Sequence, residues 1–125
     1  RKLASGSRID FYAPPIQGLP ECYVEVKSVT LDCGEGLGAF PDAVSKRASK
    51  HIEELAELRQ QGARVVLLFA VLHEGIQRVT AASHIDPVYA STLGEAVDAG
   101  LEVLAYKANI SLEQMVLGAS LPVCL

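Results

Sequence analysis

The stretch RVVLLFAVL, Arg64–Leu72, decides the fold of this chain. After Arg64 it contains only apolar residues. A strand with one solvated face alternates between apolar and polar residues, whereas an unbroken apolar run is typical of a strand that is buried on both faces of a sheet. The run is also far shorter than the ~20 residues that a membrane-spanning helix needs. The stretch therefore predicts the central strand of an α/β sheet.

The segment before this strand has the pattern of an amphipathic helix that extends from Asp42 to Gln61. Asp42 follows Pro41 and is the expected N-cap, and Gly62 is expected to end the helix. The predicted apolar stripe of this helix consists of Val44, Ala48, Ile52, Leu55 and Leu58.

The segment after the strand predicts a second helix and two further extended stretches. Asp86-Pro87 indicates a helix start, with Asp as the cap and Pro in the first position, and Gly100 is expected to end a helix over Val88–Ala99. Leu101–Ile110 alternates in the manner of a strand, and Met115–Val123 is a last short extended stretch.

Two more strands are predicted near the N-terminus. Arg8–Ala13 alternates between polar and apolar residues, and Cys22–Leu31 (CYVEVKSVTL) is rich in β-branched residues. The prolines and glycine between them indicate a turn, so the two strands are expected to form a hairpin. The glycines at 34, 36 and 38 indicate a turn or a short edge strand. Together these elements predict a single α/β domain with a mixed central sheet flanked by helices.

Composition agrees with one globular domain and limits its partners. The chain has 125 residues, of which 50% are hydrophobic, and this is enough for one core. Its net charge of −4 argues against extensive coating of nucleic acid but is compatible with a local basic patch. Three cysteines without a C-x-x-C spacing indicate reduced thiols, and with no secretory segment we expect a cytoplasmic protein. Because the chain starts without Met and almost directly with a strand, we expect it to lack an upstream domain.

Three charged residues of the predicted hairpin form the most informative pattern. Glu25 and Lys27 are two apart on one strand and project from the same face, and Asp10 faces them if the strands pair as expected. Two carboxylates suit Mg²⁺, which would lower the pKa of a bound water and neutralise charge on a phosphodiester. Lys27 would orient that water or stabilise the developing negative charge. A solvated sheet face with a salt bridge explains the same spacing, and both interpretations stay open.

The helix after the hairpin begins with the basic residues Lys46, Arg47 and Lys50 and becomes acidic later. This order opposes the helix dipole and suggests a charged partner, although a solvated face with i,i+4 charge pairs explains it too. Arg47 and His51 could point toward the pocket and touch a phosphate; alternatively, His51 is bonded locally and Arg47 passes over the core. Lys46 and Lys50 point outward and are candidates for phosphate contacts.

Several blocks of the sequence, in order, resemble the sugar fermentation stimulation protein A (SfsA) family. They are SRIDF (7–11), CYVEVKSVTL (22–31), FPDAVSKRASKHIEEL (40–55), HIDPVYASTLGEAVDAGLEVLAYKANIS (84–111) and LPVCL (121–125). Members of this family are bacterial and archaeal proteins regarded as DNA-binding, with an N-terminal OB-fold-like domain followed by a domain similar to PD-(D/E)XK nucleases. The resemblance implies that residues 1–125 are the C-terminal, restriction-endonuclease-like domain, without the OB-like domain.

The resemblance also implies roles for particular residues. The first carboxylate of the nuclease motif falls on Asp10, the second acid on Glu25 and the lysine on Lys27, so these are the expected catalytic residues. The proline of the literal motif is absent, because Ile9 precedes Asp10. The expected ligands of Mg²⁺, or of Mn²⁺, are Asp10, Glu25 and Val26. The expected DNA-binding residues are Arg8, Lys46, Arg47, Lys50 and His51.

Two functions follow from these expectations. One is Mg²⁺-dependent phosphodiester hydrolysis at Asp10, Glu25 and Lys27. The other is a non-catalytic DNA-binding or regulatory module that keeps the nuclease scaffold, with much of the grip supplied by the OB-like domain. A purely structural domain is disfavoured, because it has no reason to keep an ammonium beside two acids in apolar strands. We therefore expect a DNA-binding protein with a divalent metal and no membrane partner, and leave hydrolysis open.

Overall fold

The strand predicted from the apolar run is at the centre of the main sheet. The computed structural model describes residues 9–110 and 114–125, and β5 (Arg64–Val71) is the middle strand of its five-stranded sheet. Every residue of β5 after Arg64 is buried, as the unbroken apolar sequence indicates.

The main sheet combines parallel and antiparallel pairs. The central strand is parallel to β2 (Cys22–Val29) on one side and to β7 (Glu102–Ile110) on the other. The edge strands β1 (Phe11–Ala13) and β8 (Met115–Leu121) pair antiparallel with β2 and β7. The resulting order is β1-β2-β5-β7-β8, so the predicted mixed sheet is confirmed.

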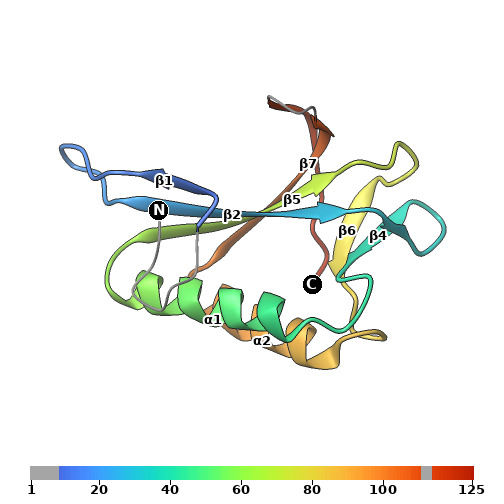
Figure 1. The fold of residues 1–125 in the computed structure, drawn as a ribbon, viewed down its shortest axis with the longest axis horizontal. Helices are drawn as coiled ribbons and strands as arrows, with labels where there is room; N and C mark the ends of the chain where they lie inside the picture. The colour runs from blue at the N-terminus through green and yellow to red at the C-terminus, as the bar shows by residue number, and fades with distance from the viewer. Residues whose placement is uncertain (1–8, 111–113) are drawn as a thin grey trace.

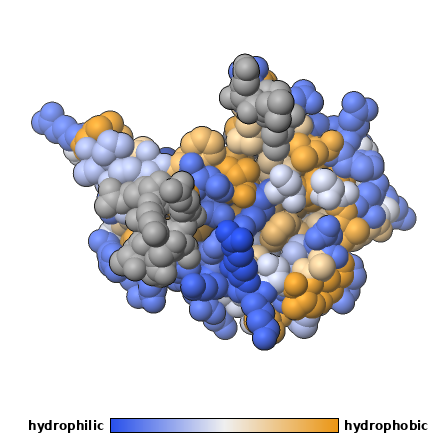
Figure 2. All heavy atoms as spheres, in the orientation of Figure 1, coloured by the Kyte–Doolittle hydropathy of each residue, from blue (hydrophilic) through white to orange (hydrophobic). Residues whose placement is uncertain are grey.

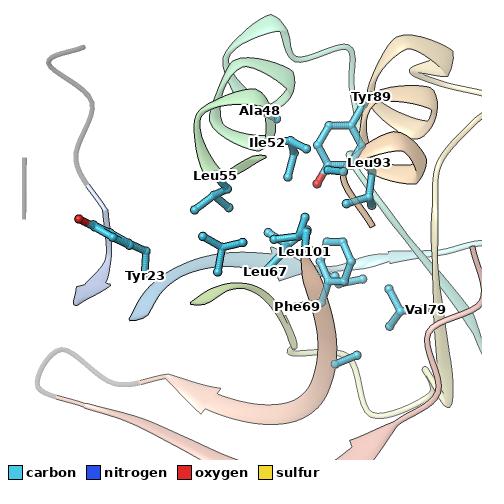
Figure 3. Close-up of a cluster of buried hydrophobic side chains, with 14 of the residues drawn as sticks. Tyr23, Ala48, Ile52, Leu55, Leu67, Phe69, Val79, Tyr89, Leu93 and Leu101 are labelled. Atoms are coloured by element: carbon cyan, nitrogen blue, oxygen red, sulfur yellow. The ribbon is translucent and has the colours of Figure 1, made fainter. Parts of the chain in front are cut away.

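The two helices, α1 (Lys46–Gln60) and α2 (Pro87–Asp98), lie on the same face of this sheet (Figure 1). They contact one another along that face, and α1 also contacts β5. The predicted α/β domain with a mixed sheet flanked by helices is therefore confirmed, with both helices on one side. Side chains between the helices and the sheet form the hydrophobic core, which includes Ile52, Leu55, Leu67, Phe69, Tyr89 and Leu93 (Figure 3).

The first helix begins later than its sequence predicted. Ser45, not Asp42, is the N-cap: its Oγ accepts a hydrogen bond of 3.0 Å from the Ala48 N–H. Val44 precedes the helix and its side chain is 69% exposed, so it does not belong to the buried stripe. The prediction of Asp42 as the cap was wrong. The N–H groups in the first turn of a helix need acceptors from outside the helix, and the Ser45 hydroxyl supplies one immediately before the first buried residues of α1.

Ser45→Ala is expected to lower the free energy of unfolding by about 1 kcal/mol, because the Ala48 N–H loses its acceptor. Asp42→Ala is the matched control. It is expected to change the free energy of unfolding by less than about 0.5 kcal/mol, since Asp42 is exposed and lies outside the helix. Denaturant unfolding measures both variants, and a larger loss at Asp42 than at Ser45 would contradict this assignment.

Asp86 caps the second helix, as predicted, and also contacts the start of the first. One carboxylate oxygen, Oδ1, accepts from the Tyr89 N–H at 3.0 Å, and Oδ2 accepts from the Ser45 N–H at 2.9 Å. These backbone hydrogen bonds hold the pKa of Asp86 below its usual value, because they favour the ionised carboxylate. A single buried acid therefore joins the N-terminal ends of α1 and α2.

A second, three-stranded sheet was only partly anticipated. It contains β3 (Leu31–Asp32), β4 (Leu37–Phe40) and β6 (Arg78–Ala81) in the order β3-β4-β6. Gly38 lies where β4 passes closest to Ile76, and an added Cβ would come within 2.7 Å of that side chain. The glycine-rich stretch was expected to be a turn or a short edge strand; it forms a turn followed by β4, which is the middle strand of this sheet and not an edge strand. β6 was not predicted, because four residues give too short an alternation to separate from a turn.

The surface in Figure 2 is largely hydrophilic where α1 lies in Figure 1, as expected for a helix with one solvated side. Within residues 9–110 and 114–125, no helix has the length and apolar character needed to span a membrane.

Candidate functional site

Glu25 and Lys27 project from β2 toward the helices. Along β2, Tyr23, Glu25 and Val29 are buried, so this alternate face of the strand is the one turned to the core. The Glu25 side chain is only 5% exposed and that of Lys27 18%. Lys27 Nζ lies 3.2 Å from Glu25 Oε1, so the two form an ion pair on the core side of the sheet.

Asp10 lies beside the same part of β2. The antiparallel register pairs Phe11 with Val24, which brings Asp10 alongside Glu25. Asp10 is exposed, and its Oδ2 accepts a hydrogen bond of 2.8 Å from the Val26 N–H. Because the N–H and C=O of one strand residue point to the same edge, the Val26 carbonyl also faces the side of β2 on which Asp10 lies. The structure thus places Asp10 and the Val26 backbone at one edge of β2, next to the position of Glu25.

His51, on the second turn of α1, completes the contacts of the buried ion pair. Its Nδ1 is 3.3 Å from Lys27 Nζ and 3.4 Å from Glu25 Oε1. Burial, and then the charge of Lys27, lower the pKa of His51 and favour its neutral form. An ammonium can only donate, so Lys27 can give one N–H to a neutral His51 and another to Glu25.

The carboxylate of Glu25 is only half satisfied. Its Oε2 is buried and has no hydrogen-bond partner among the described residues. Burial, and then the negative charge of Asp10, raise the pKa of Glu25, while Lys27 acts in the opposite direction. A bound cation would supply the missing partner of Oε2 and offset the repulsion from Asp10.

The donors at this edge fit a hard cation that keeps several water ligands. Over the part of the chain that the structure describes, no three His, Cys, Asp or Glu side chains cluster into a complete metal cage. Asp10 and Glu25 supply carboxylates and Val26 a backbone carbonyl, which is a set that Mg²⁺ or Ca²⁺ accepts together with waters and phosphate oxygens.

The predicted DNA-binding residues divide into two groups. Arg47 and His51 are i,i+4 neighbours on α1; His51 contacts Glu25, and the positive charge of Arg47 lowers the pKa of Glu25, so this side of α1 faces Glu25. Lys46 and Lys50 instead line a groove of about 280 Å³ beside the starts of both helices, where Val44 and Val88 are also exposed. Arg8 lies outside the described residues.

Tyr89 belongs to this region but was not among the predicted residues. It is fully buried in the first turn of α2, and the Glu25 charge contributes to raising its pKa, after burial. The spacing of Tyr89, Leu93 and Ala96 does predict a buried helix face. What the sequence lacks is any sign that the Glu25 charge acts on Tyr89.

The fold and the acid-x-lysine strand define a domain of the nuclease-like α/β class. A family model described as "Sugar fermentation stimulation protein RE domain" matches residues 1–114. The chain belongs to this sugar fermentation stimulation protein (SfsA) family, as its sequence blocks predicted.

One similar relative is the "Sugar fermentation stimulation protein homolog" of Pseudoalteromonas translucida (strain TAC 125), which is 55% identical over 120 residues. That match covers 93% of this chain and 50% of the relative. The solved structure of Pyrococcus furiosus SfsA in complex with Ca²⁺ is similar, with a TM-score of 0.82 and 29% identity. The structural match covers 95% of this chain and 51% of the Pyrococcus chain. The chain therefore spans about half the length of both relatives.

Proposed function

We propose that this chain binds DNA with a divalent cation held at the Asp10–Glu25 edge of β2. The observation that carries the proposal is the buried Glu25 Oε2, which has no hydrogen-bond partner within the described residues although Asp10 and Lys27 lie beside it. Asp10, Glu25 and the Val26 carbonyl would hold Mg²⁺ or Mn²⁺, and the Ca²⁺ complex of the similar Pyrococcus protein supports a divalent ion. We further propose that this is the nuclease-like domain of a protein whose OB-like domain shares in DNA binding.

The charge of the pocket explains why DNA binding would need the cation. Two carboxylates at one edge repel a phosphodiester, and the chain as a whole carries a net charge of −4. A divalent ion neutralises the acids and offers coordination sites to phosphate oxygens. Arg47, which faces the same pocket, would then contact a neighbouring phosphate.

Hydrolysis of the bound phosphodiester is a second candidate function, and the position of Lys27 favours it. The Lys27 ammonium lies 3.2 Å from Glu25, and the Lys27 side chain is still 18% exposed. From there it can donate to a phosphate oxygen or orient a water, and so stabilise negative charge that develops during the reaction. A bound cation would supply an activated water and additional charge neutralisation.

DNA binding is expected to be weak, salt-sensitive and partly dependent on the cation. Four candidate cations are Arg8, Lys46, Arg47 and Lys50, so the salt dependence should correspond to about 3–4 phosphate contacts. Arg47→Ala should weaken binding similarly across sequences and mainly when Ca²⁺ is present, because Arg47 acts beside the metal pocket. Lys46→Ala and Lys50→Ala should weaken it with or without Ca²⁺.

Fluorescence anisotropy with labelled duplexes, at several salt concentrations and with Ca²⁺ or EDTA, tests these expectations. Lys107→Ala is the control, since Lys107 is on β7, separated from β2 by β5, and donates to the Glu74 carbonyl. Binding that survives high salt, or that is unchanged in the Arg47, Lys46 and Lys50 variants, would overturn the proposed surface.

A further inference from the structure

Two buried oxygen atoms have no hydrogen-bond partner within the described residues. One is Glu25 Oε2 and the other is Tyr89 Oη. Most buried polar side-chain atoms in proteins are hydrogen-bonded, and leaving one without a partner is costly. The metal site explains part of the first case, but nothing in the proposed DNA binding explains why Tyr89 is not Phe.

Both oxygen atoms lie in the core between the helices and the main sheet. Tyr89 extends from α2 into the core beside Ile52 and Leu93 (Figure 3), and its ring packs edge-on against Phe40 with centroids 5.3 Å apart. Glu25 enters this region from the helix-facing side of β2. Phe40 also packs against Phe69, with centroids 5.8 Å apart, and Phe69 pairs in register with Lys27, so the Tyr89 ring reaches the part of the core next to Glu25 and Lys27. The contribution of the Glu25 charge to the raised pKa of Tyr89 agrees with this placement.

We propose that Tyr89 is a positioning residue whose hydroxyl and Glu25 Oε2 hold one buried water between them. The hydroxyl donates to the water, and the water donates to Oε2. Because Lys27 and His51 already contact Oε1, this second attachment fixes the rotation of the whole carboxylate. A carboxylate oxygen has two lone pairs, so Oε2 can still bind a cation.

The water bridge is argued from the two buried oxygen atoms and the packing around them, whereas its effect on metal binding rests on the proposed function. The effect of Tyr89→Phe on stability distinguishes the water bridge from a role of Tyr89 in packing alone. If the hydroxyl were simply unsatisfied, replacing it with hydrogen would remove a buried polar group and stabilise the fold. If it holds a water against Glu25, the same replacement destabilises the fold.

A thermal double-mutant cycle on the metal-free protein tests the bridge. Tyr89→Phe is expected to lower Tm by about 3–6 °C relative to the starting protein. In a Glu25→Leu background the same change is expected to have no such cost, because the water has already lost its other partner. Tyr106→Phe, a half-buried tyrosine on β7, is the control and should leave Tm unchanged. An unchanged or raised Tm in Tyr89→Phe would overturn the bridge, as would an equal loss of Tm in the Glu25→Leu background.

Calorimetric titration with Ca²⁺ measures the affinity for the cation, which a role of Tyr89 in packing alone would leave unchanged. Tyr89→Phe is expected to weaken Ca²⁺ binding about 10-fold, because groups that orient a metal ligand commonly have effects of this size. If the unaltered protein binds no Ca²⁺, the proposed metal site fails, and the thermal cycle still decides the bridge. If the unaltered protein binds Ca²⁺ and Tyr89→Phe binds it equally well, the positioning role fails.

Discussion

Glu25→Gln is expected to weaken Mg²⁺ and Ca²⁺ binding by about 100-fold or more, because it removes the charge of the buried ligand while keeping its shape. Isothermal titration calorimetry at fixed ionic strength measures the loss. Glu53→Gln is the matched control, since Glu53 is exposed on α1 and lines the groove beside Lys46 and Lys50. A Glu25→Gln protein that binds the cation as tightly as the Glu53→Gln protein would contradict the metal site.

The same substitution is expected to have the opposite effect on the metal-free fold. The pKa of Glu25 is raised by burial and by Asp10, so the folded state holds this proton more tightly than the unfolded chain does. The stabilisation from that proton is fully present below the unfolded-state pKa, near 4.5, and is lost as pH rises through the higher folded-state pKa. Gln cannot ionise, so Glu25→Gln should escape this loss.

Denaturant unfolding of both proteins across pH, in the presence of EDTA, measures this difference. The free energy of unfolding of Glu25→Gln minus that of the unaltered protein should increase as pH rises above 4.5. Asp86 contributes in the opposite direction, because its lowered pKa means that stability is lost as pH falls, but this contribution cancels in the difference. A difference that is flat with pH would show that the Glu25 carboxylate is not destabilised by its surroundings.

Lys27→Met is expected to lower phosphodiester cleavage by about 100- to 1000-fold, if the domain hydrolyses its substrate, because a donor to the transition state is lost. DNA affinity measured in Ca²⁺ should change by less than about threefold, since contacts in the ground state persist. The metal-free fold should lose stability, because Glu25 loses its ion-pair partner at 3.2 Å, and Mg²⁺ should restore part of that loss.

Lys107→Met is the matched control for this substitution, as a lysine on a strand that does not pair with β2. Cleavage is measured with a labelled duplex in Mg²⁺, and stability by denaturant unfolding with and without the metal. If Lys27→Met behaves like Lys107→Met in all three measurements, Lys27 is an ordinary strand residue.

The sequence predicted the elements with strong and continuous patterns. The apolar run Val65–Leu72 identified the middle strand, because it is short for a helix, rich in valine, and continuous as in a strand buried on both faces. Asp86-Pro87 identified the start of α2, since an acceptor before a proline is a specific start signal. The family resemblance then supplied the nuclease-like fold, which these patterns alone do not specify.

What the sequence could not predict depends on distances between elements. Ser45 and Asp42 are both acceptable caps, and only the packing of the helix on the sheet decides between them. β6 is stabilised by its pairing with β4, and its four residues are too few to show the alternation of apolar and polar residues that predicts a strand.

For the candidate site, spacing along β2 placed Glu25 and Lys27 on one face, as the structure does. The helical spacing also set Arg47 and His51 apart from Lys46 and Lys50, and the structure shows the same division. Tyr89 was missed because it is 64 residues further along the chain than Glu25 and enters the core only through the packing of α2.

Asp86, which joins the starts of the two helices, also affects how the results of a mutational screen of this domain are interpreted. Asp86 bonds to backbone N–H groups rather than to either acid of the pocket, yet it fixes the Ser45 N–H from which α1 begins. Arg47 and His51 follow within about 9 Å along the helix axis, so the position of the helix start that Asp86 holds also sets the positions of these two residues. A variant at Asp86 is therefore expected to shift Arg47 and His51 relative to Glu25, and a screen that measures function alone would not distinguish it from a variant at the candidate site.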